Sequence, residues 1–183
     1  MITRTSAAFT LIETMVAISL LTVSIVAPMS LAAQGLASAF YARDQVTASY
    51  LAQEGIETVR YIRDGNILQN SQGTNIDLLN GIPTGAPFSV DASTGAPPVV
   101  CPGGVCPALE TRVADGIYGY SGGVAGWSTT NFTREITATF IAGTINEIKV
   151  VSKVSWHTGS YQTRSLTISE NLYRWINDGS GAN

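Results

Sequence analysis

Few side chains in this sequence have the types and spacing that catalytic or metal chemistry requires. The 183 residues include one histidine, His157, and two cysteines, Cys101 and Cys106, which are too few for a four-ligand zinc site. No glycine-rich phosphate loop opens a helix. We therefore expect no enzymatic activity, no cofactor and no metal, and we interpret His157 as a surface turn residue.

Glu13 is the most informative residue of the chain. It is the only charged side chain between Arg4 and Arg43, and the twenty residues 14–33 carry no charge at all. A stretch of that length spans a bilayer as a helix. A carboxylate at the start of such a segment is costly unless it has a partner, which favours a functional role. The alternative is a solvated position at the membrane interface.

The element that carries Glu13 is predicted to be one long helix. Beyond residue 40, apolar residues recur at helical spacing on one face, namely Ala48, Ala52, Ile56, Val59 and Ile62. Gly65 and Asn66 predict that the helix ends after Arg63. Residues 9–39 are then the membrane-spanning half, and residues 40–65 are the amphipathic half that packs on a domain.

Two features of the apolar half separate it from a secretory signal peptide and from a straight rod. A signal peptide has a shorter apolar region that ends at a small-residue cleavage site, whereas this run continues as helix. Pro28 removes one backbone hydrogen bond from the helix, which predicts a kink or a melted turn.

The segment Phe9-Thr10-Leu11-Ile12-Glu13, followed by the apolar run, resembles the processing motif of type IV prepilins and of type II secretion pseudopilins. The resemblance implies that residues 1–8 are a leader, which a prepilin peptidase removes between Ala8 and Phe9. It also implies N-methylation of the new amino group. Alanine stands at position 8 where the family usually has glycine, so cleavage is expected to be slower.

The same resemblance implies a function and a set of partners. Glu13 would pair with the N-terminal amine of a neighbouring subunit and set the register of assembly into a type IV pilus or related filament. The partners would be other pilin subunits, the prepilin peptidase, an inner-membrane assembly platform and, before assembly, membrane lipid. The alternatives are a pseudopilin of a secretion or competence system, a signal-anchored surface-binding protein and an anchored enzyme.

Residues 66–183 are predicted to form an α+β domain, in which the helix packs on a small antiparallel sheet as in pilins. Residues 65–127 are rich in Gly, Pro, Ser and Asn and predict ordered loops with short strands. Three β-rich segments follow at 134–142, 147–156 and 161–168, which favours an antiparallel meander. The apolar residues near the end could add an edge strand or cover the sheet, namely Leu172, Tyr173, Trp175 and Ile176.

The remaining patterns concern export and ligands. If the domain is exported, Cys101 and Cys106 are expected to form a disulfide, and in a reducing compartment they would be free thiols. Asp64-Gly65-Asn66 and Asn75-Ile76-Asp77 hint at calcium ligands but do not fit an EF-hand, so we interpret them as helix-stop and turn residues. The net charge of −3, without a Lys/Arg cluster, excludes a dedicated nucleic-acid binder.

Overall fold

The chain forms two compact units, Met1–Arg43 and Asp44–Asn183. The computed structural model describes residues 9–77, 79–144, 147–158 and 162–173. Helix α1, Leu11–Ser71, contributes its first part to the N-terminal unit and the rest to the C-terminal unit. The long apolar helix predicted from the sequence is therefore present.

The second part of α1 has one buried face, which follows the predicted spacing. Its buried residues are Asp44, Ala48, Leu51, Ala52, Gly55, Ile56, Val59 and Asn66. Ile62, the last predicted member of the stripe, is partly buried against the same core. The helical periodicity seen in the sequence thus identified the face that packs on the sheet, because only residues three or four apart share one side of a helix.

The predicted end of α1 near Gly65 is wrong, since the helix continues to Ser71. Asn66 is buried, and its side-chain amide donates to the carbonyl of Asn80 at 2.9 Å, so it stabilises the helix instead of ending it. The true stop is a Schellman motif around Gly73, which has φ +90°. In this motif the Thr74 N–H donates to the Gln69 carbonyl at 3.0 Å.

Seven strands form one antiparallel sheet in the described part of the chain. They are β1 Phe88–Asp91, β2 Ala96–Val100, β3 Ala108–Arg112, β4 Tyr118–Gly119, β5 Trp127–Phe140, β6 Glu147–Thr158 and β7 Gln162–Tyr173. Strands β5, β6 and β7 form a meander, and the other edge of β5 is shared by β1, which pairs with β2, and β3, which pairs with β4. The α+β class and the predicted meander are confirmed.

The strand boundaries differ from the predicted ones. Strand β5 begins at Trp127, whereas the sequence predicted a start at residue 134. The prediction began too late because Ser, Thr and Asn residues at the start of the strand resemble a loop, although threonine is a good strand former. His157, predicted to lie in a turn, is part of β6, and β7 extends to Tyr173 and so includes Leu172. Trp175 and Ile176 lie outside the described residues. Strands β1 to β4 confirm the ordered loop region.

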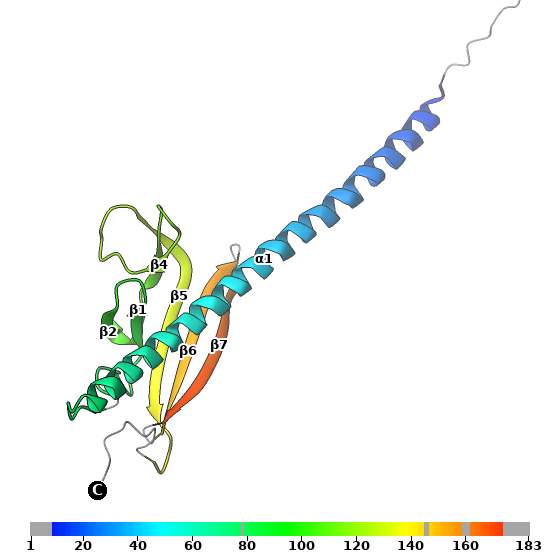
Figure 1. Ribbon diagram of the computed structural model, residues 1–183. Coiled ribbons are helices and arrows are strands. Elements are labelled where there is room, and N and C mark those ends of the chain that lie inside the picture. The colour runs from blue at the N-terminus through cyan, green and yellow to red at the C-terminus, as the bar shows by residue number, and fades with distance from the viewer. Residues whose placement is uncertain (1–8, 78, 145–146, 159–161, 174–183) are drawn as a thin grey trace, which may run out of the picture. The chain divides into compact units, whose positions relative to one another are not determined.

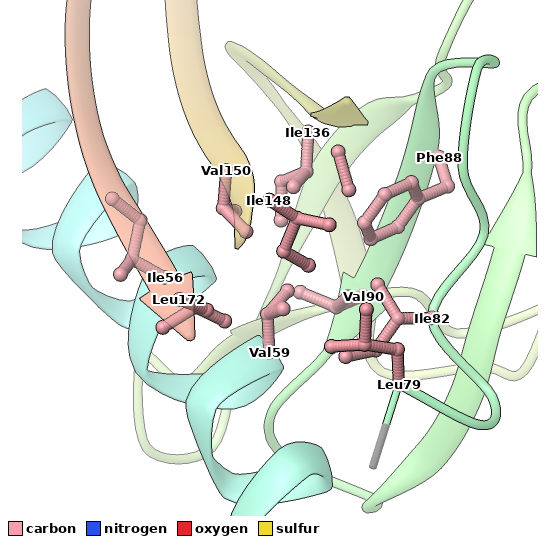
Figure 2. Packing of buried hydrophobic residues seen from close by; sticks show 11 residues of the cluster. Ile56, Val59, Leu79, Ile82, Phe88, Val90, Ile136, Ile148, Val150 and Leu172 are labelled. Atoms are coloured by element: carbon pink, nitrogen blue, oxygen red, sulfur yellow. The ribbon is translucent and has the colours of Figure 1, made fainter. Parts of the chain in front are cut away.

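The core lies between the second part of α1 and the inner face of the sheet, as Figure 1 and Figure 2 show. Ile56 and Val59 of the helix face Leu172 of β7 and Val150 of β6. Phe88 and Val90 of β1 complete the cluster together with Leu79, Ile82, Ile136, Ala138 and Ile148. The helix therefore covers the apolar face that the sheet cannot expose to water.

Gly55 lets α1 approach the sheet closely, and its replacement should show this. A Cβ at residue 55 would lie 2.9 Å from Ser152 Oγ and 3.0 Å from Ile136 Cδ1. We expect Gly55→Ala to lower the free energy of unfolding by about 1–3 kcal/mol through overpacking. Gly65→Ala is the matched control, because no atom lies within 4 Å of that Cβ. It should raise stability by up to about 1 kcal/mol. Thermal unfolding in detergent, followed by tryptophan fluorescence, checks both; equal effects would contradict the close approach.

Candidate assembly segment

The predicted processing site lies just before α1. Phe9 is 77% exposed and precedes the first helical residue, Leu11. Ala8 lies outside the described residues. The predicted cut between Ala8 and Phe9 stays a prediction, and the exposure of Phe9 is compatible with it.

Thr10 and Glu13 form the first turn of α1. The backbone N–H of Glu13 donates to Thr10 Oγ1 at 3.3 Å, and the N–H of Thr14 donates to the Thr10 carbonyl at 3.2 Å. Thr10 is therefore the N-cap, and Glu13 stands at the third helical position, which is the Thr-x-x-Glu spacing of a capping box. The spacing of Thr10 and Glu13 is visible in the sequence, although no helix cap was predicted from it. Glu13, which is exposed, thus has a local role at the positive end of the helix in addition to any role in assembly.

Large apolar side chains surround the next turns of α1, and all of them are exposed. Residues 9–40 are exposed without exception. The large apolar ones are between 52% and 78% exposed from Phe9 to Leu36, and they include Leu11, Ile12, Met15, Leu20, Ile25, Met29 and Leu31. Within the described residues, α1 is the helix long and apolar enough to cross a membrane. A helix that is apolar on every side requires lipid or other helices around it.

Four hydroxyl groups of this segment are satisfied by its own backbone. Each of the four donates to a carbonyl three or four residues earlier, at 2.5–3.0 Å: Thr14 to Leu11, Ser19 to Met15, Thr22 to Ile18 and Ser24 to Leu21. Such back-bonding removes the cost of placing a hydroxyl in hydrocarbon. Residues 14–24 are therefore compatible with an apolar environment.

Two further features of the segment bear on the predicted membrane span. Helical structure continues through Pro28, so no melted turn occurs there, and the predicted kink stays a prediction. Near the end of the N-terminal unit, the guanidinium carbon of Arg43 lies 5.4 Å from the centre of the Phe40 ring. Aromatic and basic residues of this kind are typical of the membrane–water interface.

A buried arginine joins α1 to the sheet, and the sequence analysis missed it. Arg134 of β5 is fully buried, and its Nη1 donates to Glu54 at 2.6 Å and to the Leu51 carbonyl at 3.0 Å, both in α1. Its Nη2 donates to the Val90 carbonyl of β1 at 2.7 Å. One side chain thus connects three elements, and we call Arg134 together with these three partners the Arg134 centre. The signal was its position in the alternating apolar series of β5, where Arg134 precedes Ile136 by two residues.

A second arginine, which also joins α1 to the sheet, provides a comparison. Arg60 of α1 pairs with Glu57 at 2.6 Å and with Glu170 of β7, but its side chain is 34% exposed, against 1% for Arg134. The hydrogen bond to Glu170 raises the pKa of Arg60. Because water screens the Arg60 pairs, breaking one of them should cost the fold far less than leaving the buried Arg134 without its counter-charge.

The cysteines form a disulfide, as predicted for an exported domain. Cys101 and Cys106 are joined, with their Cα atoms 4.7 Å apart, and both are buried. They enclose the 3₁₀ turn Pro102–Gly104, in which Gly103 and Gly104 have positive φ. The Cys101 N–H donates to the Pro87 carbonyl at 2.9 Å, so the loop is also tied to the entry of β1.

Removal of the disulfide should have only a small effect. We expect the Cys101→Ser/Cys106→Ser double variant to lose about 2 kcal/mol or less, because a five-residue separation constrains the unfolded chain little. Its circular dichroism should keep the helix and strand signals of the wild type. Thermal unfolding under oxidising conditions measures the difference, with the reduced wild type as control. Complete unfolding of the double variant would contradict a local role for the loop.

The other residues that the sequence suggested for catalysis or metal binding do not form a common site. His157 lies in β6, where its Nδ1 is 3.3 Å from Thr163 Oγ1 of β7. Asp64 pairs with Arg63 inside α1, and Asp77 accepts the N–H of Leu79 in a turn. Among the described residues, no group of three or more His, Cys, Asp or Glu side chains could hold a metal ion.

Comparison with known proteins adds no relative to this picture. No protein-family model, no curated protein and no solved structure matches the chain.

Proposed function

We propose that this chain is a type IV pilin-like structural subunit, anchored in the cytoplasmic membrane by the first part of α1 and assembled through it into an extracytoplasmic filament. The supporting observation is that residues 9–40 are exposed on every side while being mostly apolar, with Glu13 as their single charge. Such a surface requires lipid in one state and other helices in another.

Three further observations support the proposal. The cap at Thr10 makes α1 begin directly after Phe9, so removal of residues 1–8 would place a free amine next to the first turn of the helix. The disulfide fits an oxidising compartment outside the cytoplasm. The Arg134 centre and the apolar core attach the second part of α1 to a sheet domain.

In this proposal the partners of the chain are other copies or related subunits, a prepilin peptidase, an inner-membrane assembly platform and lipid. The amine created at Phe9 is the group that Glu13 of a neighbouring subunit would meet. A charge pair in an apolar environment depends strongly on geometry, so it suits the setting of register better than the supply of net stability. A pseudopilin of a secretion or competence system would use the same segment in the same way.

The mature N-terminus tests the proposal most directly. Mass spectrometry of the protein from host membranes should find a chain that starts at Phe9 and carries one added methyl group. The variant Ala8→Gly should be processed at least as fast, since glycine is the usual residue at that position in the resembled motif. An unprocessed N-terminus, or a cut beyond the apolar run, would instead favour a plain signal-anchored protein or a secreted one.

A further inference from the structure

Strand β7 forms one edge of the sheet, and it lacks the usual features that prevent an edge from pairing with another strand (Figure 1). Its twelve residues, Gln162–Tyr173, pair with β6 along their whole length. Among the described residues, no strand pairs with the other side of β7. The strand contains no proline and its register with β6 has no bulge, whereas the edge strand β2 carries Pro97 and Pro98. Because natural edges are protected by such features, a long unprotected edge favours a partner strand.

The backbone groups on the open side of β7 belong to its odd-numbered residues. The Ile141 N–H donates to the Glu147 carbonyl at 3.0 Å, which identifies these two as a hydrogen-bonded pair of the β5–β6 ladder. Such pairs recur at every second residue, so the odd-numbered residues of β6 bond to β5 and the even-numbered ones bond to β7. The partners in β7 are also even-numbered, as in the pair of Ile148 with Leu172. The outward backbone groups therefore belong to Thr163, Ser165, Thr167, Ser169 and Asn171.

The sequence of β7 is nearly symmetrical about Thr167, which suits it to antiparallel pairing with a second copy of itself. A two-fold axis at Thr167 places residue 165 opposite residue 169 and residue 163 opposite residue 171. These odd-numbered residues have their backbone groups outward in both copies, so they form the hydrogen-bonded pairs that an antiparallel ladder requires. Their side chains are exposed, uncharged and able to form hydrogen bonds across the strands.

The even-numbered residues in the same register are complementary in charge and in polarity. Arg164 lies opposite Glu170 of the second copy, and Leu166 lies opposite its Ile168. In these non-hydrogen-bonded pairs the side chains approach most closely, and opposite charges or two apolar groups stabilise them. The two neighbouring registers that keep the backbone pairing would place Arg164 opposite Ile168 or Leu172 instead. Charge complementarity thus selects the register centred on Thr167.

We propose that the open edge of β7 is a self-association surface, through which two copies of this chain form one continuous antiparallel sheet with Thr167 at the two-fold axis. The occupant is a second copy, because the pairing of Arg164 with Glu170 occurs twice in one symmetric interface. Glu170 also accepts from Arg60 of its own chain, and a carboxylate has acceptor sites for both guanidinium groups. The surface lies within the C-terminal unit, so the proposal requires neither membrane insertion nor a filament.

A mixture of two cysteine variants of the full chain, purified in detergent, tests the register. Residue 165 faces residue 169 of the second copy at a Cα separation of about 5.5 Å, which a disulfide spans. In either variant alone the two new thiols are offset by about 14 Å along the strands, which is too far. Under mild oxidation, Ser165→Cys mixed with Ser169→Cys should give a covalent dimer, and each variant alone should give little. The wild type, whose cysteines are already joined, is the blank.

Two results of the mixing experiment would overturn the proposal. One is the absence of a covalent dimer from the mixture, which would mean that the edge of β7 does not pair with a second β7. The other is an equal yield from the mixture and from each variant alone, which is the result expected if copies associate only through α1 or by random collision.

Proline at the two-fold axis tests whether the backbone makes the contact. The Thr167 N–H points outward, so Thr167→Pro removes no hydrogen bond within the chain but two between the copies. In both cysteine variants it should lower the yield of dimer by at least about fivefold. Thr167→Val keeps the N–H and should retain the yield, and circular dichroism of both should match the wild type. An undiminished yield from Thr167→Pro would overturn the pairing.

A side-chain substitution tests the same register without a change to the backbone. Arg164→Glu places two carboxylates opposite each other on both sides of the axis, and Arg164 is exposed. The yield of dimer from the mixture should fall by about two- to fivefold, because like charges directly opposite destabilise a strand pair. Arg164→Lys keeps the charge and should retain most of the yield. Equal yields from Arg164→Glu and Arg164→Lys would contradict the register centred on Thr167.

Discussion

Glu13→Gln should reduce incorporation into filaments by at least about tenfold, which corresponds to the loss of about 1.4 kcal/mol, while membrane insertion stays unchanged. Glutamine keeps the backbone N–H that donates to Thr10 Oγ1, and the apolar residues 14–33 are untouched. The substitution therefore removes the charge and little else. The measurement compares the membrane-bound and filament-bound fractions of the two proteins from the native host.

Thr10→Ala is the control that separates charge from capping. It removes the cap, at a cost of about 1 kcal/mol to the first turn, but leaves the carboxylate of Glu13 in place. We expect Thr10→Ala to keep most of the filament incorporation. If Glu13→Gln assembles normally while Thr10→Ala does not, Glu13 acts as a capping residue and the register hypothesis is wrong.

Glu54→Gln should lower the free energy of unfolding by about 3 kcal/mol, because it leaves the buried guanidinium of Arg134 without its counter-charge. The value lies at the low end for a broken buried pair, since the Glu54 side chain is 38% exposed and two carbonyls still accept from Arg134. Thermal or denaturant unfolding of the full chain in detergent measures the change.

The matched control is Glu57→Gln, one turn further along the same helix. Glu57 also pairs with an arginine at 2.6 Å, but its side chain is 62% exposed and Arg60 keeps Glu170 as a second partner. The loss should be about 0.5 kcal/mol or less. Similar losses from the two variants would mean that the burial of Arg134 does not decide its contribution to stability.

Local periodicity is the part of this structure that a single sequence encodes most directly. The stripe of Ala48, Ala52, Ile56 and Val59 was predictable because a helix repeats every 3.6 residues whatever it packs against. The end of the helix was not, because Asn66 is held by a carbonyl of residue 80, and a stop signal can be overruled by such a tertiary contact. The motif at Gly73 was visible, but Gly65 came first in the chain.

The Arg134 centre shows a different limit of sequence reasoning. A charged residue on the apolar face of a strand can be recognised from alternation, since Arg134 precedes Ile136 by two residues. Its partners cannot, because Glu54, Leu51 and Val90 come from elements that only the fold brings together. The role of Glu13 stands between these cases. Its capping partner, Thr10, is local and readable, whereas a partner on another subunit depends on assembly.

The Arg134 centre also determines how the C-terminal unit would respond to mechanical tension. The chain enters this unit at Asp44 through α1, so a pull on the chain before Asp44 acts on the helix before it acts on any strand. The bonds of Arg134 to Leu51 and Glu54, together with the buried contacts from Ala48 to Val59, oppose sliding of the helix on the sheet in parallel. Loading in this shear geometry requires many contacts to break together, so forced extraction of the helix is governed by the unfolding rate of the unit.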